Sequence, residues 1–310
     1  YLDIVPDERA QESDTWKTEG AVRGYLYSCY GYLPANRTFG NSYWLVEELT
    51  AVTKELFTTF KYGYYSPVSL GFTSNTWSTI WNGIHQCYMF QESLKQVSNE
   101  YVTDEMKKQY LAESNFLIAY YHFLSMRSYG PTMIIRSVID LETPISGFPE
   151  RSSIDEVVAF INEKLDEAMS EGGLPTTWSG KDYGRATRLA ALALKSRVYL
   201  YMEDWKNAAI YARKVIDDWD FMLTDLISLP QKTTAQPYYN FISQDCSEVI
   251  WVFGKIANFV NLVKQQMMFP DPYKPGQNLE TNFFNASSEL LEAFKAGDLR
   301  KENYIVRSPY

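Results

Sequence analysis

Histidine, cysteine and positive charge are all scarce in this sequence. The two histidines, His85 and His122, cannot supply a multi-histidine metal site, and we interpret each as a hydrogen-bonded packing residue. The three cysteines, Cys29, Cys87 and Cys246, have no CxxC spacing, which predicts buried free thiols rather than a zinc site or a disulfide framework. Lysine and arginine number 29 against 38 acidic residues, for a net charge of −9. This balance argues against nucleic acid as a partner.

Long apolar runs and cofactor motifs are absent as well. Residues 62–91 carry no charged side chain, but Ser, Thr, Asn and Gly interrupt them too often for a membrane span. There is no GxGxxG and no GxSxG, so neither a dinucleotide fingerprint nor a nucleophile elbow is present. No cofactor is predicted, and the sequence leaves open whether a calcium ion supports a loop. Because the chain starts at Tyr1 rather than Met, we expect that an upstream segment such as a signal peptide has been removed.

Aromatic residues are abundant by contrast. Tyrosine (24), phenylalanine (17) and tryptophan (8) bring the aromatic share to 16% of the chain. Rings that are apolar on the face and polar at the edge suit wet surfaces that bind hydroxylated ligands, because a ring can stack on the C–H face of a sugar. For each single ring, the alternative is that it only pins a loop to the scaffold. The rings that we predict to bind glycan lie in loop-like stretches: Tyr62, Tyr64, Tyr65, Tyr238, Tyr239, Phe259 and Tyr273. Four other rings fit helix or strand faces and are expected in the core: Trp77, Trp81, Trp205 and Trp251.

Apolar periodicity predicts a mostly α-helical fold with short β elements. Apolar residues spaced i, i+3, i+4, i+7 predict helices over 186–201 and 205–217, joined so tightly that they must be antiparallel, as in a tetratricopeptide repeat. A longer pair covers 105–128 and 153–168, and the second of these opens with a Ser153–Glu156 capping box. Further elements are expected as helices at 18–33, 41–59, 76–98 and 287–296 and a strand at 248–253.

No linker separates a second domain, so we expect one domain over residues 1–310. Its helical repeat scaffold covers about 18–220, and a loop-rich ligand side covers about 221–310, with 60–76 also contributing.

Paired carboxylates keep an enzyme as an alternative, because a glycosidase or lyase needs two acids across a sugar ring. The obvious pairs, Glu47–Glu48 and Asp217–Asp218, are adjacent on helices and point about 100° apart, so a solvated helix face is the better interpretation. A third hypothesis is a tetratricopeptide-type scaffold that binds peptides.

Three blocks of sequence resemble the SusD/RagB family of outer-membrane nutrient-binding lipoproteins. They are AESNFLIAYYHFLSMRSYGPTMII (112–135), ERSSIDEVVAFINEKLDEAM (150–169) and GRATRLAALALKSRVYLYMEDWKNAAIYARKVID (184–217), supported by YLDIVP (1–6) and SEVIWVF (247–253). Their order and spacing cover about a third of the chain. The resemblance implies a SusD-like fold with tetratricopeptide-type hairpins and long aromatic loops, of which the C-terminal part is missing here.

The resemblance also implies a function. Members of this family are non-catalytic receptors that catch oligosaccharides or polysaccharide outside the cell and deliver them to a SusC-like TonB-dependent transporter. It implies that the helical repeats face the transporter and that the ligand site lies on the loop-rich side. A lipid anchor upstream of Tyr1 would hold the protein to the outer membrane, facing the extracellular side.

Overall fold

The computed structural model describes residues 16–33, 53–54, 71–140, 142–144, 147–178, 180–218, 250–251, 285–286 and 292–298. The chain divides into two units, Tyr1–Leu33 with Trp77–Trp219, and Pro34–Thr76 with Asp220–Tyr310. Nearly all of the described residues belong to the first unit, which is the helical one.

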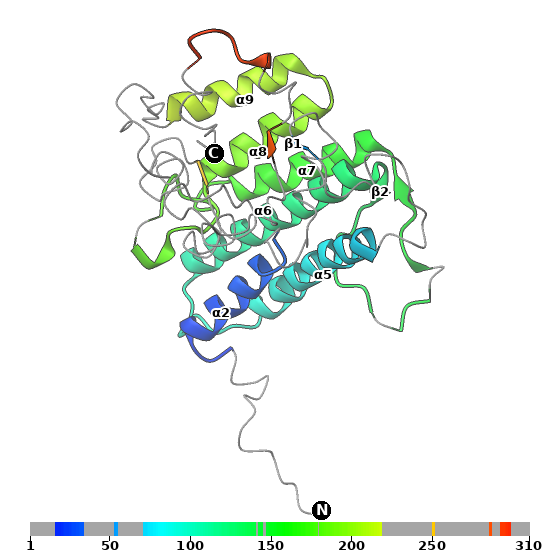
Figure 1. Cartoon of the computed structure of the whole chain (residues 1–310). Helices are drawn as coiled ribbons and strands as arrows, with labels where there is room; N and C mark the ends of the chain where they lie inside the picture. Colours follow the sequence, from blue (N-terminus) through cyan, green and yellow to red (C-terminus); the bar gives the residue numbers. More distant parts are fainter. Residues whose placement is uncertain are drawn as a thin grey trace, which may run out of the picture. The chain divides into compact units, whose positions relative to one another are not determined.

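The first unit is a stack of helices (Figure 1). Its centre is helix α6 (Asp104–Tyr129). On one side of α6 lie helix α2 (Glu19–Tyr30) and helix α5 (Gly71–Leu94), which belongs to this unit from Trp77 on. On the other side follow α7 (Ile154–Ala168), α8 (Arg188–Tyr201) and α9 (Trp205–Asp218). A short 3-10 turn, η2 (Gly180–Asp182), precedes α8. Strands β2 (Thr132–Met133) and β3 (Arg151–Ser152) pair antiparallel beside the C-terminal end of α6. The two predicted helix pairs, 105–128 with 153–168 and 186–201 with 205–217, are thus confirmed.

Local sequence explains where these helices begin. Helices α2, α6, α7 and α8 each follow a hydroxyl side chain that accepts a hydrogen bond from the backbone N–H three residues on, at Thr18, Thr103, Ser153 and Thr187. At Ser153 the predicted capping box is complete, because the Glu156 carboxylate also accepts from the Ser153 backbone N–H at 2.8 Å. At the start of each of these four helices, a neighbouring side chain therefore satisfies at least one free backbone N–H without help from distant residues.

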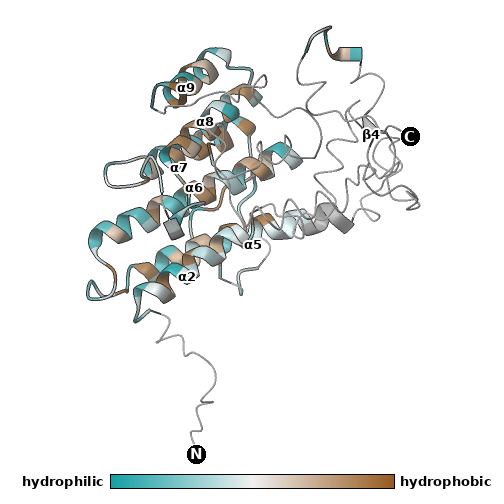
Figure 2. Cartoon of the chain, turned by 60° about the vertical axis from the view of Figure 1, so that its left-hand side comes forward, coloured by the Kyte–Doolittle hydropathy of each residue, from teal (hydrophilic) through white to brown (hydrophobic). Residues whose placement is uncertain are grey.

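Helix α6 is the centre of the core. Its buried side chains run along almost its whole length, and helices that are apolar on several sides belong in the interior. Outer helices bury one face only, so brown and teal residues alternate along them in Figure 2. On α9 the buried residues are Ala208 and Val215, whereas the Trp205 side chain is 63% exposed. The expectation that Trp205 is a core residue is therefore wrong, because the side chain of this first residue of α9 lies mostly in solvent.

The α8–α9 hairpin closes through three residues, Met202–Asp204, and confirms the predicted antiparallel pair. Glu203 adopts a φ of 57°, the left-handed conformation that such a tight reversal requires. The Asp204 carboxylate then accepts a hydrogen bond from the Asn207 backbone N–H at 3.0 Å and starts α9.

The second unit contains strand β1 (Thr53–Lys54), which pairs antiparallel with β4 (Asn285–Ala286). At Thr53 and Lys54 the expected helix over 41–59 is wrong, because pairing with a segment more than two hundred residues away overrides the local pattern. Ile250 and Trp251 lie in irregular backbone rather than in the expected strand. Glu292 and Ala293 are helical, as expected for 287–296.

Candidate functional site

The seven aromatic residues predicted to bind glycan lie outside the described residues. They are Tyr62, Tyr64, Tyr65, Tyr238, Tyr239, Phe259 and Tyr273. Their role stays a prediction.

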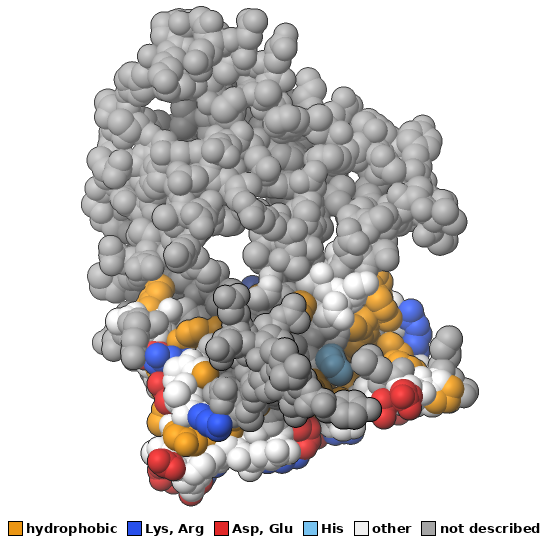
Figure 3. Space-filling model, turned by 90° about the horizontal axis from the view of Figure 1, so that it is seen from below, with side chains coloured by type: hydrophobic (Ala, Val, Ile, Leu, Met, Phe, Trp, Pro, Cys, Tyr) orange, Lys and Arg blue, Asp and Glu red, His pale blue; other side chains and the backbone are white. Residues whose placement is uncertain are grey.

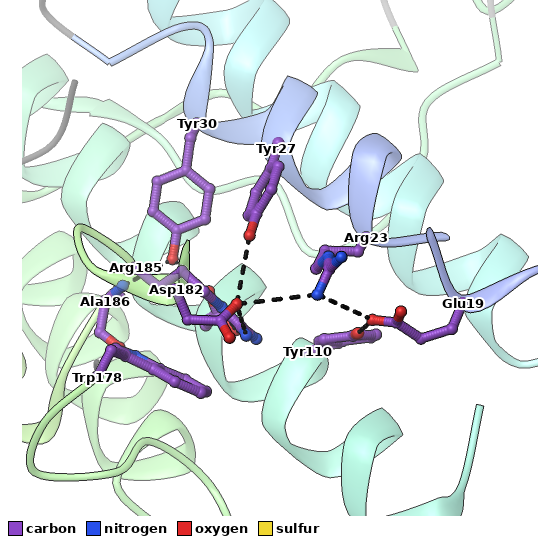
Figure 4. Close-up of polar contacts among 10 residues, drawn as sticks. Glu19, Arg23, Tyr27, Tyr30, Tyr110, Trp178, Asp182, Arg185 and Ala186 are labelled. Atoms are coloured by element: carbon purple, nitrogen blue, oxygen red, sulfur yellow. Dashed lines mark hydrogen bonds and ion pairs between the residues drawn. The ribbon is translucent and has the colours of Figure 1, made fainter. Parts of the chain in front are cut away.

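The described residues instead contain a dense group of charged and aromatic side chains where α2, α6 and the segment before α8 meet (Figure 4). We call this group the Arg185 cluster; its members are Glu19, Arg23, Tyr27, Tyr30, Tyr110, Glu113, Trp178, Asp182 and Arg185.

Helical spacing explains how the cluster is assembled. Glu19, Arg23 and Tyr27 are four residues apart and share one face of α2. Tyr110 and Glu113 are three apart on α6 and face them. Tyr30 ends α2, and the last three members come from the turn-rich segment before α8, where Gly180 and Gly184 take positive φ values of 60° and 97°. Three segments far apart in the sequence therefore deliver one polar group.

The inner part of the cluster is a buried ion pair. Glu113 is 0% exposed and Arg185 is 7% exposed. The Arg185 guanidinium donates to both carboxylate oxygens of Glu113, with Nε 3.2 Å from each. The Tyr30 hydroxyl donates to Glu113 Oε2 at 2.6 Å and accepts from the Ala186 backbone N–H at 2.8 Å. We call this contact between α2, α6 and the segment before α8 the first joint. Each polar atom at its centre has a hydrogen-bond partner, which is the condition for burying charge.

Burial and pairing act in opposite directions on this carboxyl group. Desolvation outweighs the hydrogen bonds from Arg185 and Tyr30, so the pKa of Glu113 lies above its ordinary value. Burial also raises the pKa of the Tyr30 hydroxyl well above its ordinary value, and the neighbouring Glu113 charge adds to that rise. Tyr30 is thus held as a neutral donor to a carboxylate whose cation is fixed beside it.

The outer part of the cluster reaches the surface. Asp182 accepts from Arg185 at 2.9 Å, and the Tyr27 hydroxyl lies 3.5 Å from the same Asp182 oxygen. The Tyr110 hydroxyl donates to Glu19 at 2.7 Å. The Arg185 guanidinium lies 3.8 Å from the centre of the Trp178 ring, whose indole N–H donates to the Ala186 carbonyl at 2.8 Å. This cation–π stack covers the buried charge.

The cluster is a structural joint rather than a ligand site. Its two central carboxylates, Glu113 and Asp182, are both bound to Arg185 and are not placed on opposite sides of an open cleft as a glycosidase needs. Glu113 is out of reach of any ligand. Sequence reasoning missed this role, although an acidic residue on the apolar face of α6 and an arginine directly before the alanine-rich helix were both visible.

A second joint binds the C-terminal half of α6 to β2 and α7 without buried charge. His122 is fully buried; its Nδ1 lies 2.8 Å from the Ile118 carbonyl, and its Nε2 lies 3.5 Å from the Ile135 backbone N–H. These contacts assign the proton to Nδ1 of a neutral ring, and burial lowers the pKa of His122 to about 4. The hydroxyls of Ser125 and Thr132 lie 2.8 Å apart. His122 is the packing residue that was expected, whereas His85 is exposed on α5 and is not.

Other candidate chemistry resolves into ordinary contacts. Asp217 pairs with Arg213 at 2.7 Å and Asp218 with Arg188 at 3.9 Å, as expected for a solvated helix face. Glu47 and Glu48 lie outside the described residues. Within the described ranges no group of three or more His, Cys, Asp or Glu side chains could hold a metal ion. In the same part of the chain no helix has the length and apolar character to cross a bilayer.

One face of the described surface is mixed in character. Figure 3 shows hydrophobic, basic and acidic side chains interspersed among the described residues of that face.

Comparison with known proteins decides the family. A SusD-like family model, described as starch-binding and associating with the outer membrane, matches residues 1–200, more than half of the chain. The chain belongs to the SusD-like family. The resemblance to this family is thereby confirmed; residues 112–135, 150–169 and the first part of 184–217 lie inside the matched range. No curated protein sequence matches this SusD-like chain.

Solved structures confirm the fold. A SusD superfamily protein from Parabacteroides distasonis matches with a TM-score of 0.70 at 20% identity, over 92% of this chain and 61% of that protein. The surface glycan-binding protein A from Bacteroides fluxus matches with a TM-score of 0.64 at 21% identity, over 93% and 64%. A SusD-like protein from Bacteroides fragilis matches with a TM-score of 0.64 at 24% identity, over 79% of this chain and 46% of that protein. This SusD-like chain therefore spans 46% to 64% of the length of these relatives.

Proposed function

We propose that this SusD-like chain is the scaffold and ligand side of a non-catalytic receptor that binds oligosaccharides or polysaccharide at the cell surface. The observation that carries the proposal is the family match over residues 1–200. It is supported by similar solved structures whose names state a carbohydrate ligand. Among them are surface glycan-binding protein A and a laminarin-binding SusD-like protein, the latter with a TM-score of 0.58. The abundance of aromatic residues fits the same ligand class.

The proposed contacts are the loop aromatics Tyr62, Tyr64, Tyr65, Tyr238, Tyr239, Phe259 and Tyr273. Although these residues form two stretches far apart in the sequence, both stretches fall within the residue ranges of the second unit. Stacking against a few sugar rings in a shallow site gives weak binding. The expected dissociation constant is in the high micromolar to millimolar range, which corresponds to a binding free energy of ~4–6 kcal/mol.

The test is isothermal titration of the chain against starch-derived maltooligosaccharides, laminarin and a wider panel of plant, host and microbial glycans. Heat on one glycan class with intact chains supports the receptor. New reducing ends in the same samples would instead identify the glycosidase or lyase alternative. Binding of peptides with indifference to sugars would identify the peptide scaffold.

The site is tested by replacing each of the seven rings with alanine. We expect at least one variant to lose most of the binding. Trp205→Ala is the matched control, because this ring is 63% exposed but belongs to the helical unit. Unchanged affinity in all seven variants, or equal loss in the control, would overturn the site assignment.

Delivery to a SusC-like TonB-dependent transporter and a lipid anchor upstream of Tyr1 complete the proposal. Support for both comes from the description of the family, which associates it with the outer membrane. Palmitate labelling and protease accessibility of the full gene product in intact cells test the anchor and the outward orientation. Co-purification with the transporter from the same cells tests the partnership.

A further inference from the structure

Two of the three cysteines meet between α2 and α5. Cys29 and Cys87 are both 0% exposed and both free, as the sequence predicted; Cys246 lies outside the described residues. The Cys29 thiol lies 3.6 Å from the carbonyl oxygen of Gln86, the residue directly before Cys87. Burial raises the pKa of the Cys87 thiol well above its ordinary value, and the nearby Cys29 thiol adds to that rise. The Cys29 sulfur therefore lies beside the backbone that carries Cys87, although 57 residues separate the two cysteines in the sequence.

The backbone on each side of this pair is fixed by α6. The Tyr121 hydroxyl donates to the Cys29 carbonyl at 2.6 Å, and the Ser114 hydroxyl donates to the Cys87 carbonyl at 3.3 Å. Beside the thiols, the Gln86 amide donates to the Ser28 hydroxyl at 3.0 Å. These contacts hold the backbone of both cysteines in place from outside the pair.

We propose that Cys29 and Cys87 form a disulfide when the protein folds in an oxidising compartment, and that this bond ties α2 to α5. The location rests on the proposed cell-surface function, since a protein exported to the outer membrane crosses the oxidising periplasm. The two thiols lose two protons and two electrons as the S–S bond forms. A disulfide of a dithiol oxidant accepts the electrons and is reduced to two thiols.

The bond forms before the fold closes. The thiolate is the reactive species, and in the folded protein burial raises the pKa of the Cys87 thiol well above its ordinary value. With both side chains fully buried, a folded and reduced protein lacks the access that exchange requires. The same burial shields the bond from reductants once it exists.

The test compares the chain produced in the cytoplasm of a bacterial host with the same chain exported to its periplasm. Free thiols are blocked with N-ethylmaleimide under denaturing conditions, and the labels are located by mass spectrometry. We expect three labels on the cytoplasmic protein and one, at Cys246, on the exported protein. The exported protein should also contain a linked peptide pair holding Cys29 and Cys87. Its thermal midpoint should be higher by on the order of 5 °C, because the bond closes a long loop.

Two variants keep the test decisive. In Cys246→Ala the linked pair must persist, which excludes pairing through the third cysteine. In Cys87→Ala the linked pair and the thermal shift between the two preparations must both vanish. Three labels on a folded exported protein, or a bond that involves Cys246, would overturn the proposal. Glycan titration of the same preparations tests the proposed function separately, because loss of sugar binding would leave the label count unchanged.

Discussion

Helix α6 is held to its neighbours by two joints that use opposite chemistry. Near its N-terminal half, the Arg185 cluster buries a full ion pair and satisfies it with the Tyr30 hydroxyl. Near its C-terminal half, the joint with β2 and α7 buries the neutral His122 and a pair of hydroxyls. The charged pair of this second joint, Arg136–Glu163, stays at the surface with side chains 58% and 43% exposed.

The contrast shows where each joint is vulnerable. A buried pair that loses one partner leaves an unpaired charge in the interior, and that cost is large. A buried neutral histidine does not lower the free energy of unfolding at neutral pH, but it does so in acid, where the unfolded chain takes up a proton at this residue. An exposed ion pair is screened by water and salt and contributes little.

The largest effect is expected from Arg185→Met. This change leaves the Glu113 carboxylate buried without its cation and should lower the free energy of unfolding by about 3–5 kcal/mol. Urea unfolding followed by circular dichroism measures it. The double variant Glu113→Gln, Arg185→Met should recover part of the loss because no charge remains. A loss below about 1 kcal/mol in the single variant would show that the pair does not hold the first joint.

The second joint should weaken in acid. The pKa of His122 is about 4 in the folded protein and 6.5 in the unfolded chain. Between these pH values the residue is therefore protonated in the unfolded chain and neutral in the folded protein. Stability is unaffected by this group above pH 6.5 and falls as the pH drops towards 4, by about 3 kcal/mol in total. Unfolding of the parent and of His122→Gln across this range measures the effect. Parallel pH profiles for the two proteins would contradict it.

A smaller loss is expected where α5 approaches α6. A Cβ at Gly83 would lie 2.7 Å from the Tyr121 ring, whose hydroxyl is already fixed on the Cys29 carbonyl. Gly83→Ala should therefore destabilise by about 1–3 kcal/mol through overpacking. Gly24→Ala is the matched control, because nothing lies within 4 Å of that Cβ in α2. The control should gain about 0.5–1 kcal/mol from helix propensity, and equal signs for the two changes would refute the close approach.

The smallest effect is expected from Glu163→Gln. The change removes the exposed partner of Arg136, which retains its contact with the Phe160 ring at 4.8 Å. The expected loss is at most about 1 kcal/mol, and added salt should reduce it further. A salt-independent loss as large as that of Arg185→Met would erase the distinction between the joints.

Features set by near neighbours in the chain were predictable from the sequence. The Ser153–Glu156 capping box and the α8–α9 hairpin depend on residues three or four positions apart, and both are confirmed. The Glu113–Arg185 pair joins residues 72 positions apart, so no local pattern announces it. Periodicity marked the faces of α9 but not what covers them, which is why Trp205 was misjudged. For the glycan site, composition and family indicate the ligand class, while the choice among the seven rings depends on how distant loops meet.

The contacts of Tyr30 set an order of assembly. Its hydroxyl binds Glu113 and Ala186, which follow it by 83 and 156 residues. A helix of 12 residues such as α2 is too short to be stable alone in water. Both contacts of the Tyr30 hydroxyl can therefore form only after Glu113 and Ala186 have come to lie against α2. The position of α2 is thus fixed by segments that follow it in the sequence and not by its own residues.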